Sequence, residues 1–275
     1  MNKLSMEKQV RVIGGLVEGC SIRSIERMTG IHRDTIMRLS VRVGEGCTRL
    51  MDETMRGLKC EQIQVDELWS YVGKKQRHVT DSDDKSRVGD AWTFVAMDRD
   101  TKLVPCFRVG KRTAPDAKAF IQDLAGRLET RCQLSSDGLK AYIEACELAF
   151  GSNIDYGQIV KSYEAEPMGA GRYSPPKVVA TEKTIICGNP DHSKISTSHI
   201  ERLNLTTRMQ MRRFTRLTNA FSKKIENLRA AVGLHFAHYN LARVHGSLRV
   251  TPAMEAGIST HIWELEELIE AAAAN

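Results

Sequence analysis

The sequence lacks any pair of cysteines at the Cys-x-x-Cys spacing that structural zinc sites use. Its seven cysteines stand singly along the chain, and no secretory signal precedes them. We therefore expect a cytoplasmic, reducing environment in which most thiols are small core residues. Cys187 and His192 offer half of a zinc site, but no second pair follows, which argues against structural zinc.

Long apolar runs are also missing. No stretch approaches the roughly 18 residues that a membrane-spanning helix needs, so we expect no membrane partner. The length of 275 residues allows one large domain and one small one.

Acidic residues are scarce where basic residues are dense. Residues 199–249 hold ten Lys and Arg against two Asp and Glu, and residues 1–60 hold eleven against seven. Residues 250–275 have five acids and no Lys or Arg. The two basic stretches indicate two contact regions for a polyanion such as nucleic acid. The alternative is that these side chains only solvate helix faces.

Apolar residues recur at helical spacing in residues 4–43 and predict three short helices. Residues 21–39 resemble a helix-turn-helix, with Gly30 at the turn between two helices. The second of these helices would expose side chains suited to base edges and phosphates: Arg33, Thr35, Arg38 and Arg42. A generic three-helix bundle is the alternative. We expect residues 44–60 to form a helical connector that ends at a domain boundary near Cys60.

The remaining chain alternates between strand-like and helix-like patterns. Alternating polar and apolar residues predict strands, and Pro105 marks the third as an edge strand. The expected strands are 62–73, 91–98, 103–110, 132–138 and 157–163. The expected helices are 115–128, 139–150, 197–216, 221–244 and 261–274. Residues 164–196 are rich in glycine and proline, and we expect an irregular insertion with at most a short strand at 177–180.

Three acids occupy notable positions in this order of elements. Asp66 interrupts the first strand although aspartate is a poor strand former, and Asp137 ends the fourth strand beside a glycine. Glu201 is the single acid in an arginine-rich helix. The order is that of ribonuclease H-like folds, in which the first and fourth strands are neighbours, and would bring the three together. Each acid taken alone has another interpretation. Asp137 could serve only to form the Asp-Gly turn, and Glu201 could be a solvated helix residue. Glu67 or Asp98 could take the place of Asp66.

Four separated motifs carry a resemblance to a known family. Residues 65–73, 136–138, 198–204 and 238–253 resemble the DDE transposases of bacterial insertion sequences, specifically the family of the first insertion sequence described. That family belongs to the retroviral-integrase-like superfamily. The similarity covers about residues 20–257, and the chain departs from some relatives in lacking a cysteine-rich zinc finger before the helix-turn-helix.

The resemblance implies specific roles. Asp66, Asp137 and Glu201 would be the catalytic triad that binds Mg²⁺ or Mn²⁺, as two ions, and Arg208 the basic residue two turns further on. Neighbouring arginines would hold the DNA: Arg202, Arg212 and Arg213. The protein would bind the terminal inverted repeats of its element, cleave them and join them to target DNA. It would act as a homo-oligomer, in a bacterial cytoplasm and associated with the nucleoid.

The resulting prediction is an α/β fold with a ribonuclease H-like mixed sheet flanked by helices, preceded by a small all-α helix-turn-helix domain. We assign residues 1–60 to the helix-turn-helix and connector, 61–219 to the catalytic domain with the insertion at 164–196, and 220–275 to C-terminal helices. Two other functions stay open: a transposase-derived DNA-binding regulator without catalysis, and a metal-dependent ribonuclease of the same fold.

Overall fold

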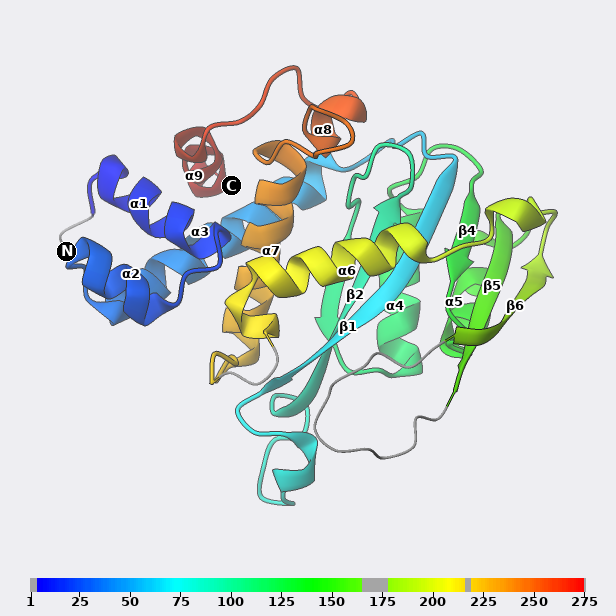
Figure 1. The fold of residues 1–275 in the computed structure, drawn as a ribbon, viewed down its shortest axis with the longest axis horizontal. Helices are drawn as coiled ribbons and strands as arrows, with labels where there is room; N and C mark the ends of the chain where they lie inside the picture. The colour runs from blue at the N-terminus through cyan, green and yellow to red at the C-terminus, as the bar shows by residue number, and fades with distance from the viewer. Residues whose placement is uncertain (1–3, 165–177, 216–218, 275) are drawn as a thin grey trace.

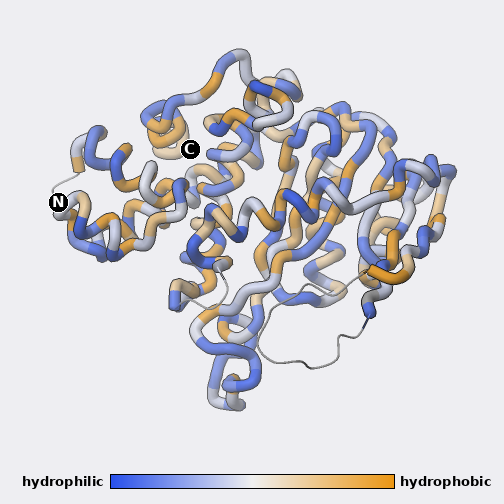
Figure 2. Tube along the Cα trace, in the orientation of Figure 1, coloured by the Kyte–Doolittle hydropathy of each residue, from blue (hydrophilic) through white to orange (hydrophobic). Residues whose placement is uncertain are grey.

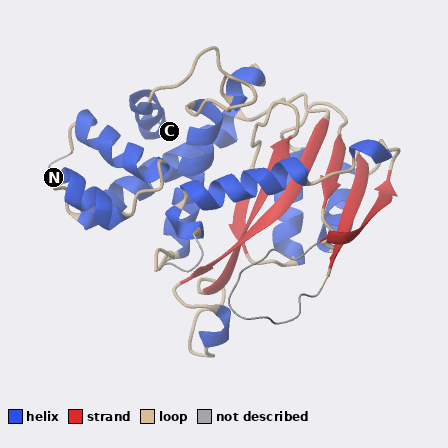
Figure 3. Cartoon of the chain, in the orientation of Figure 1, coloured by secondary structure: helices blue, strands red, loops and turns tan. Residues whose placement is uncertain are grey.

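The computed structural model of the chain describes residues 4–164, 178–215 and 219–274. It is an α/β structure with an open, mixed sheet flanked by helices (Figures 1 and 3). The six strands lie in the order β3-β2-β1-β4-β5-β6. Their bounds are β1 (Gln62–Val72), β2 (Gly89–Asp98), β3 (Phe107–Gly110), β4 (Gln133–Ser136), β5 (Asp155–Tyr163) and β6 (Val178–Cys187).

Strand β1 is the centre of the sheet. It pairs with β2 in antiparallel register, with Asp66 opposite Val95, and with β4 in parallel register, with Val65 opposite Ser136. The predicted adjacency of the first and fourth strands is therefore confirmed. The strand expected at 103–110 begins only at Phe107, after Pro105. Its predicted edge position is confirmed, since within the described sheet β3 pairs with β2 alone.

Helices cover the two faces of the sheet. Helices α4 (Ala114–Ala125) and α5 (Ala141–Phe150) pack on one face, where Phe94 of β2 contacts the rings of Phe120 and Tyr142. Helix α6 (Ser198–Gln210) crosses the other face over β1 and β2 (Figure 1). Alternate residues of β1 therefore face α6 and the α4–α5 pair.

The irregular insertion expected at 164–196 contains a strand that is much longer than the short strand expected at 177–180. Residues 178–187 form strand β6, which pairs antiparallel with β5 along nearly its whole length. Most of its side chains are exposed on both faces of the strand, so the alternating pattern of a half-buried strand is absent from the sequence. Residues 165–177 of that stretch lie outside the described residues.

The N-terminal and C-terminal helices pack together. The first three are α1 (Met6–Val17), α2 (Ile22–Thr29) and α3 (Arg33–Thr54), so the third predicted helix and most of the predicted connector form one helix. Helix α3 packs against α7 (Ile225–Leu241) and α9 (Leu265–Ala274), and α8 (Pro252–Glu255) lies between these two in sequence. Glycines of α3 permit close approach to both partners: Gly44 meets Ala230, and Gly46 meets Ala272.

Strands β1 and β2 extend beyond the rest of the sheet and are joined by a loop containing a short 3-10 helix, η1 (Gln76–His78). This extension projects at the bottom of Figure 1 and is mostly hydrophilic in Figure 2. Two further 3-10 helices, η2 (His192–Lys194) and η3 (Arg212–Phe214), flank α6, so the predicted helix 197–216 ends early. Among the described residues, no helix combines the length and apolarity needed to cross a membrane.

Two buried histidines of α7 make the stability of the fold depend on pH. Burial lowers the pKa of His235 to about 3 and that of His238 to about 4. Both values lie below the ordinary pKa of about 6.5, so the unfolded chain binds more protons below that pH. We expect each histidine to lower the free energy of unfolding by up to about 1.4 kcal/mol per pH unit as the pH falls from 6.5 towards 4.

Urea denaturation of the wild type and of His235→Gln, from pH 7.5 to 4.5 in EDTA, tests this. The difference between the two proteins isolates the contribution of His235. A single profile would not, because burial raises the pKa of Asp66 to about 6 and that of Glu67 to about 7, and these carboxyls raise the free energy of unfolding as the pH falls. Relative to the wild type, the variant should lose less stability on acidification. Parallel pH profiles for the two proteins would contradict the assignment.

Candidate metal site on strands β1 and β4

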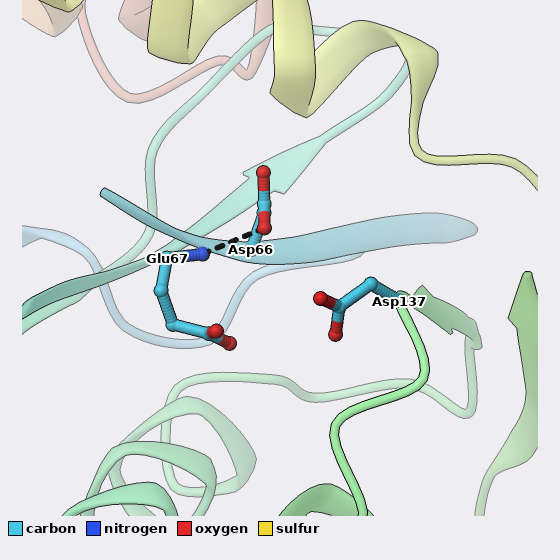
Figure 4. Close-up of side chains that lie close together, drawn as sticks. All are labelled: Asp66, Glu67 and Asp137. Atoms are coloured by element: carbon cyan, nitrogen blue, oxygen red, sulfur yellow. Dashed lines mark hydrogen bonds between the residues drawn. The ribbon is translucent and has the colours of Figure 1, made fainter. Parts of the chain in front are cut away.

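Three carboxylates meet where β1 and β4 lie side by side. One oxygen from each of Asp66, Glu67 and Asp137 lies within 4.8 Å of the others. Asp66 and Glu67 are consecutive on β1, so their side chains leave the strand in opposite directions, and the Asp137 carboxylate turns towards them from the end of β4 (Figure 4). Asp66 faces α6, whereas Glu67 faces the α4–α5 side.

Asp66 is half-buried and held at both oxygens. Its Oδ1 accepts a hydrogen bond from the backbone N–H of Glu67 at 2.8 Å, and its Oδ2 accepts one from Nδ2 of Asn204 at 2.8 Å. Asn204 lies on α6, so this bond ties the helix to the site. Burial raises the pKa of Asp66 to about 6, and the negative charges of Asp137 and Glu201 add to the rise. The cause is the cost of holding several carboxylates close together away from water.

Glu67 is more deeply buried, with a side chain only 1% exposed. Its Oε2 accepts a hydrogen bond from Nε of Arg112 at 3.1 Å. Its Oε1 has no partner of normal hydrogen-bond geometry among the described residues. Burial, followed by the charges of Asp137 and Asp66, raises the pKa of Glu67 to about 7, although the nearby Tyr142 hydroxyl and Arg112 act in the opposite direction.

Asp137 is the most accessible of the three, with a side chain 40% exposed. Its Oδ1 accepts a hydrogen bond from the N–H of Leu139 at 3.0 Å, which is the turn-making role that the Asp-Gly sequence suggested. Its Oδ2 lies 3.6 Å from Nη2 of Arg112. Arg112 therefore spans Glu67 and Asp137, and its guanidinium also lies 4.9 Å from the ring centroid of Trp92.

Glu201 is not among the three converging carboxylates. It forms an ion pair with Lys161 of β5 and accepts a hydrogen bond from the Thr197 hydroxyl at 2.6 Å. Its charge nevertheless contributes to the raised pKa of Asp66, so the two acids are within electrostatic reach. Gln64 fixes the start of α6 over β1, because its Oε1 accepts hydrogen bonds from the N–H groups of His199 and Ile200, each at 3.0 Å.

Asp98, one alternative to Asp66, has a different role. It is buried at the end of β2 opposite Ile63, and its Oδ2 accepts hydrogen bonds from the N–H and hydroxyl of Thr101 at 3.1 and 2.6 Å. These contacts hold the turn that follows β2. Asp98 is thus a turn residue, three positions along the β1–β2 ladder from Asp66.

The predicted DNA-contacting residues differ in accessibility. On α3, Arg33, Arg38 and Arg42 are exposed and Thr35 is partly exposed. Arg42 donates a hydrogen bond to Oε1 of Gln9 at 2.8 Å.

Around α6, Arg202 and Arg212 are exposed, and Arg208, two turns after Glu201, is partly buried. Arg213 donates to the Ser222 hydroxyl at 2.8 Å, and burial lowers its pKa, so part of its donor capacity is used within the protein.

Sequence reasoning did not anticipate that Glu67 and Arg112 would join the site. The sequence indicates Glu67 only as a substitute for Asp66, although it shows two adjacent acids on one expected strand. Arg112 follows β3 and carries no local signal, since only the folded sheet brings the β3–α4 loop to β4.

Comparison with known proteins adds no assignment. Neither a scan of protein-family models nor a search of curated proteins found a match for this chain. The chemistry of the site therefore rests on its own geometry. Carboxylate oxygens at these separations are hard ligands of the kind that divalent cations such as Mg²⁺ and Mn²⁺ prefer.

Proposed function

We propose that this protein is a DNA transposase that binds the ends of an insertion sequence and catalyses metal-dependent strand cleavage and strand transfer. The observation that carries the proposal is the parallel pairing of β1 with β4, which brings Asp137 close to Asp66, whose Oδ2 accepts a hydrogen bond from Asn204 of α6. Three carboxylates close together destabilise the fold unless a bound cation or a basic side chain neutralises their charge. A merely structural sheet has no need of them.

The proposal includes a ribonuclease H-like catalytic fold and a helix-turn-helix. In support of the first, the sheet has its first and fourth strands adjacent and parallel, with a helix bearing an acid across one face. In support of the second, Gly30 ends α2 in the left-handed region, with φ of 68°, and α3 begins at Arg33. The exposed arginines of α3 suit phosphate contacts and base edges.

The carboxylates of Asp66, Asp137 and Glu201 would hold the divalent ions. When bound, such ions activate a water or a DNA 3′-hydroxyl and stabilise the leaving oxygen. Asn204 keeps Asp66 oriented, and Gln64 keeps α6 in register over β1. For Glu201 to join the other two, its ion pair with Lys161 must open. Arg202 and Arg212, exposed on the same segment, would hold the negatively charged backbone near the scissile bond.

Double-stranded DNA is the partner that the charge distribution favours. In the basic segment from 199 to 249 most of the charge lies on α6 and on the stretches that flank α7, and the second basic stretch includes α1 to α3. Joining two element ends requires both to be held at once, so the proposal includes a homo-oligomer that synapses them.

A strand-transfer assay tests the proposal. Purified protein is mixed with a labelled duplex of its element's end and a plasmid target, in Mg²⁺, Mn²⁺ or EDTA. We expect joined product with either metal and none with EDTA or with Glu201→Gln. Glu255→Gln is the matched control, since Glu255 is an exposed acid on α8, and it should join at the wild-type rate.

The ion pair between Glu201 and Lys161 favours one second candidate, a transposase-derived DNA-binding regulator without catalysis. Such a protein would bind the element's end with its basic helices and leave the acids paired. End binding without nicking or joining in either metal would replace the transposase proposal with this one.

A further inference from the structure

We propose that Glu67 completes a divalent-cation site with Asp66 and Asp137 in the DNA-free protein, and that Arg112 is the resident counter-charge that the cation displaces. This site uses Glu67 in place of Glu201. The inference rests on the proposed function only for what the cation does once it is bound, because cation binding itself needs no DNA.

The spacing of the oxygens fits one cation. Two ligands on opposite sides of an ion lie at twice the metal–oxygen distance, which is about 4.2 Å for Mg²⁺ and about 4.6–5.2 Å for Ca²⁺. The three carboxylates each offer an oxygen within 4.8 Å of the others, so a cation can bridge them after at most a small contraction.

Glu67 supplies the independent sign of a ligand site. Its side chain is 1% exposed, and its Oε1 has no hydrogen-bond partner of normal geometry among the described residues, although the equally buried hydroxyl of Tyr142 lies near the carboxylate. An unpaired buried carboxylate oxygen is costly, and native proteins seldom leave one without a role. In Figure 4 the Glu67 and Asp137 carboxylates lie on the same side of β1, with their oxygens turned towards one another.

Arg112 makes contacts with the carboxylates that a bound cation would otherwise make. It donates to Oε2 of Glu67 at 3.1 Å and lies 3.6 Å from Oδ2 of Asp137, so it contacts two of the three carboxylates. Its side chain is 38% exposed and belongs to the loop between β3 and α4, which leaves it free to move aside. The Trp92 ring offers a cation–π contact that holds the guanidinium nearby after displacement.

Glu201 is engaged elsewhere in this state. Lys161 and Thr197 both contact its Oε1, and its carboxylate is not part of the group of converging oxygens. The first cation should therefore bind without it. This separates Glu201, needed for strand transfer, from Glu67, needed for the cation in the absence of DNA.

Titration of the DNA-free protein with Mn²⁺, with free ion measured by electron paramagnetic resonance, tests the proposal. We expect one site in the wild type. Glu67→Gln should weaken it about tenfold or more, since the charge count of the ligands sets affinity. Arg112→Gln should tighten it about tenfold, because a competing positive charge is removed. Glu201→Gln should change the affinity less than about twofold.

Asp98→Asn is the matched control, a buried carboxylate on the neighbouring strand whose turn contacts an asparagine can keep. It should bind Mn²⁺ as the wild type does. If Glu67→Gln does not fold, Glu67→Asp replaces it, because the shorter side chain keeps the charge but withdraws the oxygen, and it should also weaken binding. Wild-type affinity in a folded Glu67 variant, or loss of the site in Glu201→Gln, would overturn the proposal.

The two proposals fail in different ways. Absence of strand transfer with intact, Glu67-dependent Mn²⁺ binding would contradict the transposase function alone. Strand transfer with Mn²⁺ binding that ignores Glu67 would contradict this inference alone.

Discussion

Replacing Asp66 with asparagine should lower the rate of strand transfer at least about a thousandfold, equivalent to about 4 kcal/mol of transition-state stabilisation. The physical reason is that asparagine is neutral and a poor ligand for a hard cation, while the proposed reaction depends on charge compensation at this point. Binding to the element's end should stay within about twofold, because the arginines of α3 lie on a different part of the molecule.

Asparagine at position 66 should keep the hydrogen bonds that hold the Asp66 side chain. An asparagine at this position can still accept the hydrogen bond from the N–H of Glu67. Its new amide can donate to Asn204 once the Asn204 amide turns over, because the Oδ1 of Asn204 is buried and has no partner among the described residues. The fold should therefore survive, and the lost activity should report on the chemistry.

Strand transfer and end binding are measured on the same preparation, the first by joined product on a gel and the second by fluorescence anisotropy of the labelled duplex. Glu255→Gln again serves as the control for a neutralised acid outside the site. Joining by Asp66→Asn at the wild-type rate would remove Asp66 from the catalytic assignment.

Replacing Gly44 with alanine should destabilise the protein by about 3 kcal/mol, the upper end of the range for overpacking. A Cβ at Gly44 would overlap the carbonyl oxygen of Ala230 on α7. Backbone atoms cannot change rotamer, so the two helices must move apart along their contact. The direction of the change in stability is informative, because the same substitution in an isolated helix would stabilise that helix by about 1 kcal/mol.

Thermal unfolding measures the effect, and a loss of this size should lower the midpoint by about 6–12 °C in a chain of this length. Gly246→Ala is the control, since no atom of the described residues lies within 4 Å of its added Cβ and its backbone is not left-handed. A Gly44→Ala midpoint at or above the wild-type value would mean that α3 and α7 are not packed as described.

Much of the sheet follows from local sequence. The alternation in residues 62–73 and the apolar run of 91–98 predict β1 and β2, and Pro105 predicts the edge. Short-range periodicity suffices there because one face of each strand must be buried. The position of Asp137 after a strand and before a glycine likewise indicates its place at the end of β4.

The length of strand β6 does not follow from such reasoning, which allows only a short strand at 177–180. The strand has no buried face to impose a pattern, and its strand conformation comes from hydrogen bonding to β5. The close packing of Gly44 on Ala230 and of Gly46 on Ala272 was equally invisible, since these pairs join opposite ends of the chain.

The sequence by itself determined the order of the elements from β1 to β5 and the three positions of Asp66, Asp137 and Glu201, because periodicity and residue type are local properties. Only the tertiary structure decided which acids converge. It joined Glu67 to Asp66 and Asp137, placed Arg112 across them, and paired Glu201 with Lys161. The physical reason is that convergence depends on strand pairing and side-chain contacts between residues far apart in the chain, and no local pattern encodes these distances.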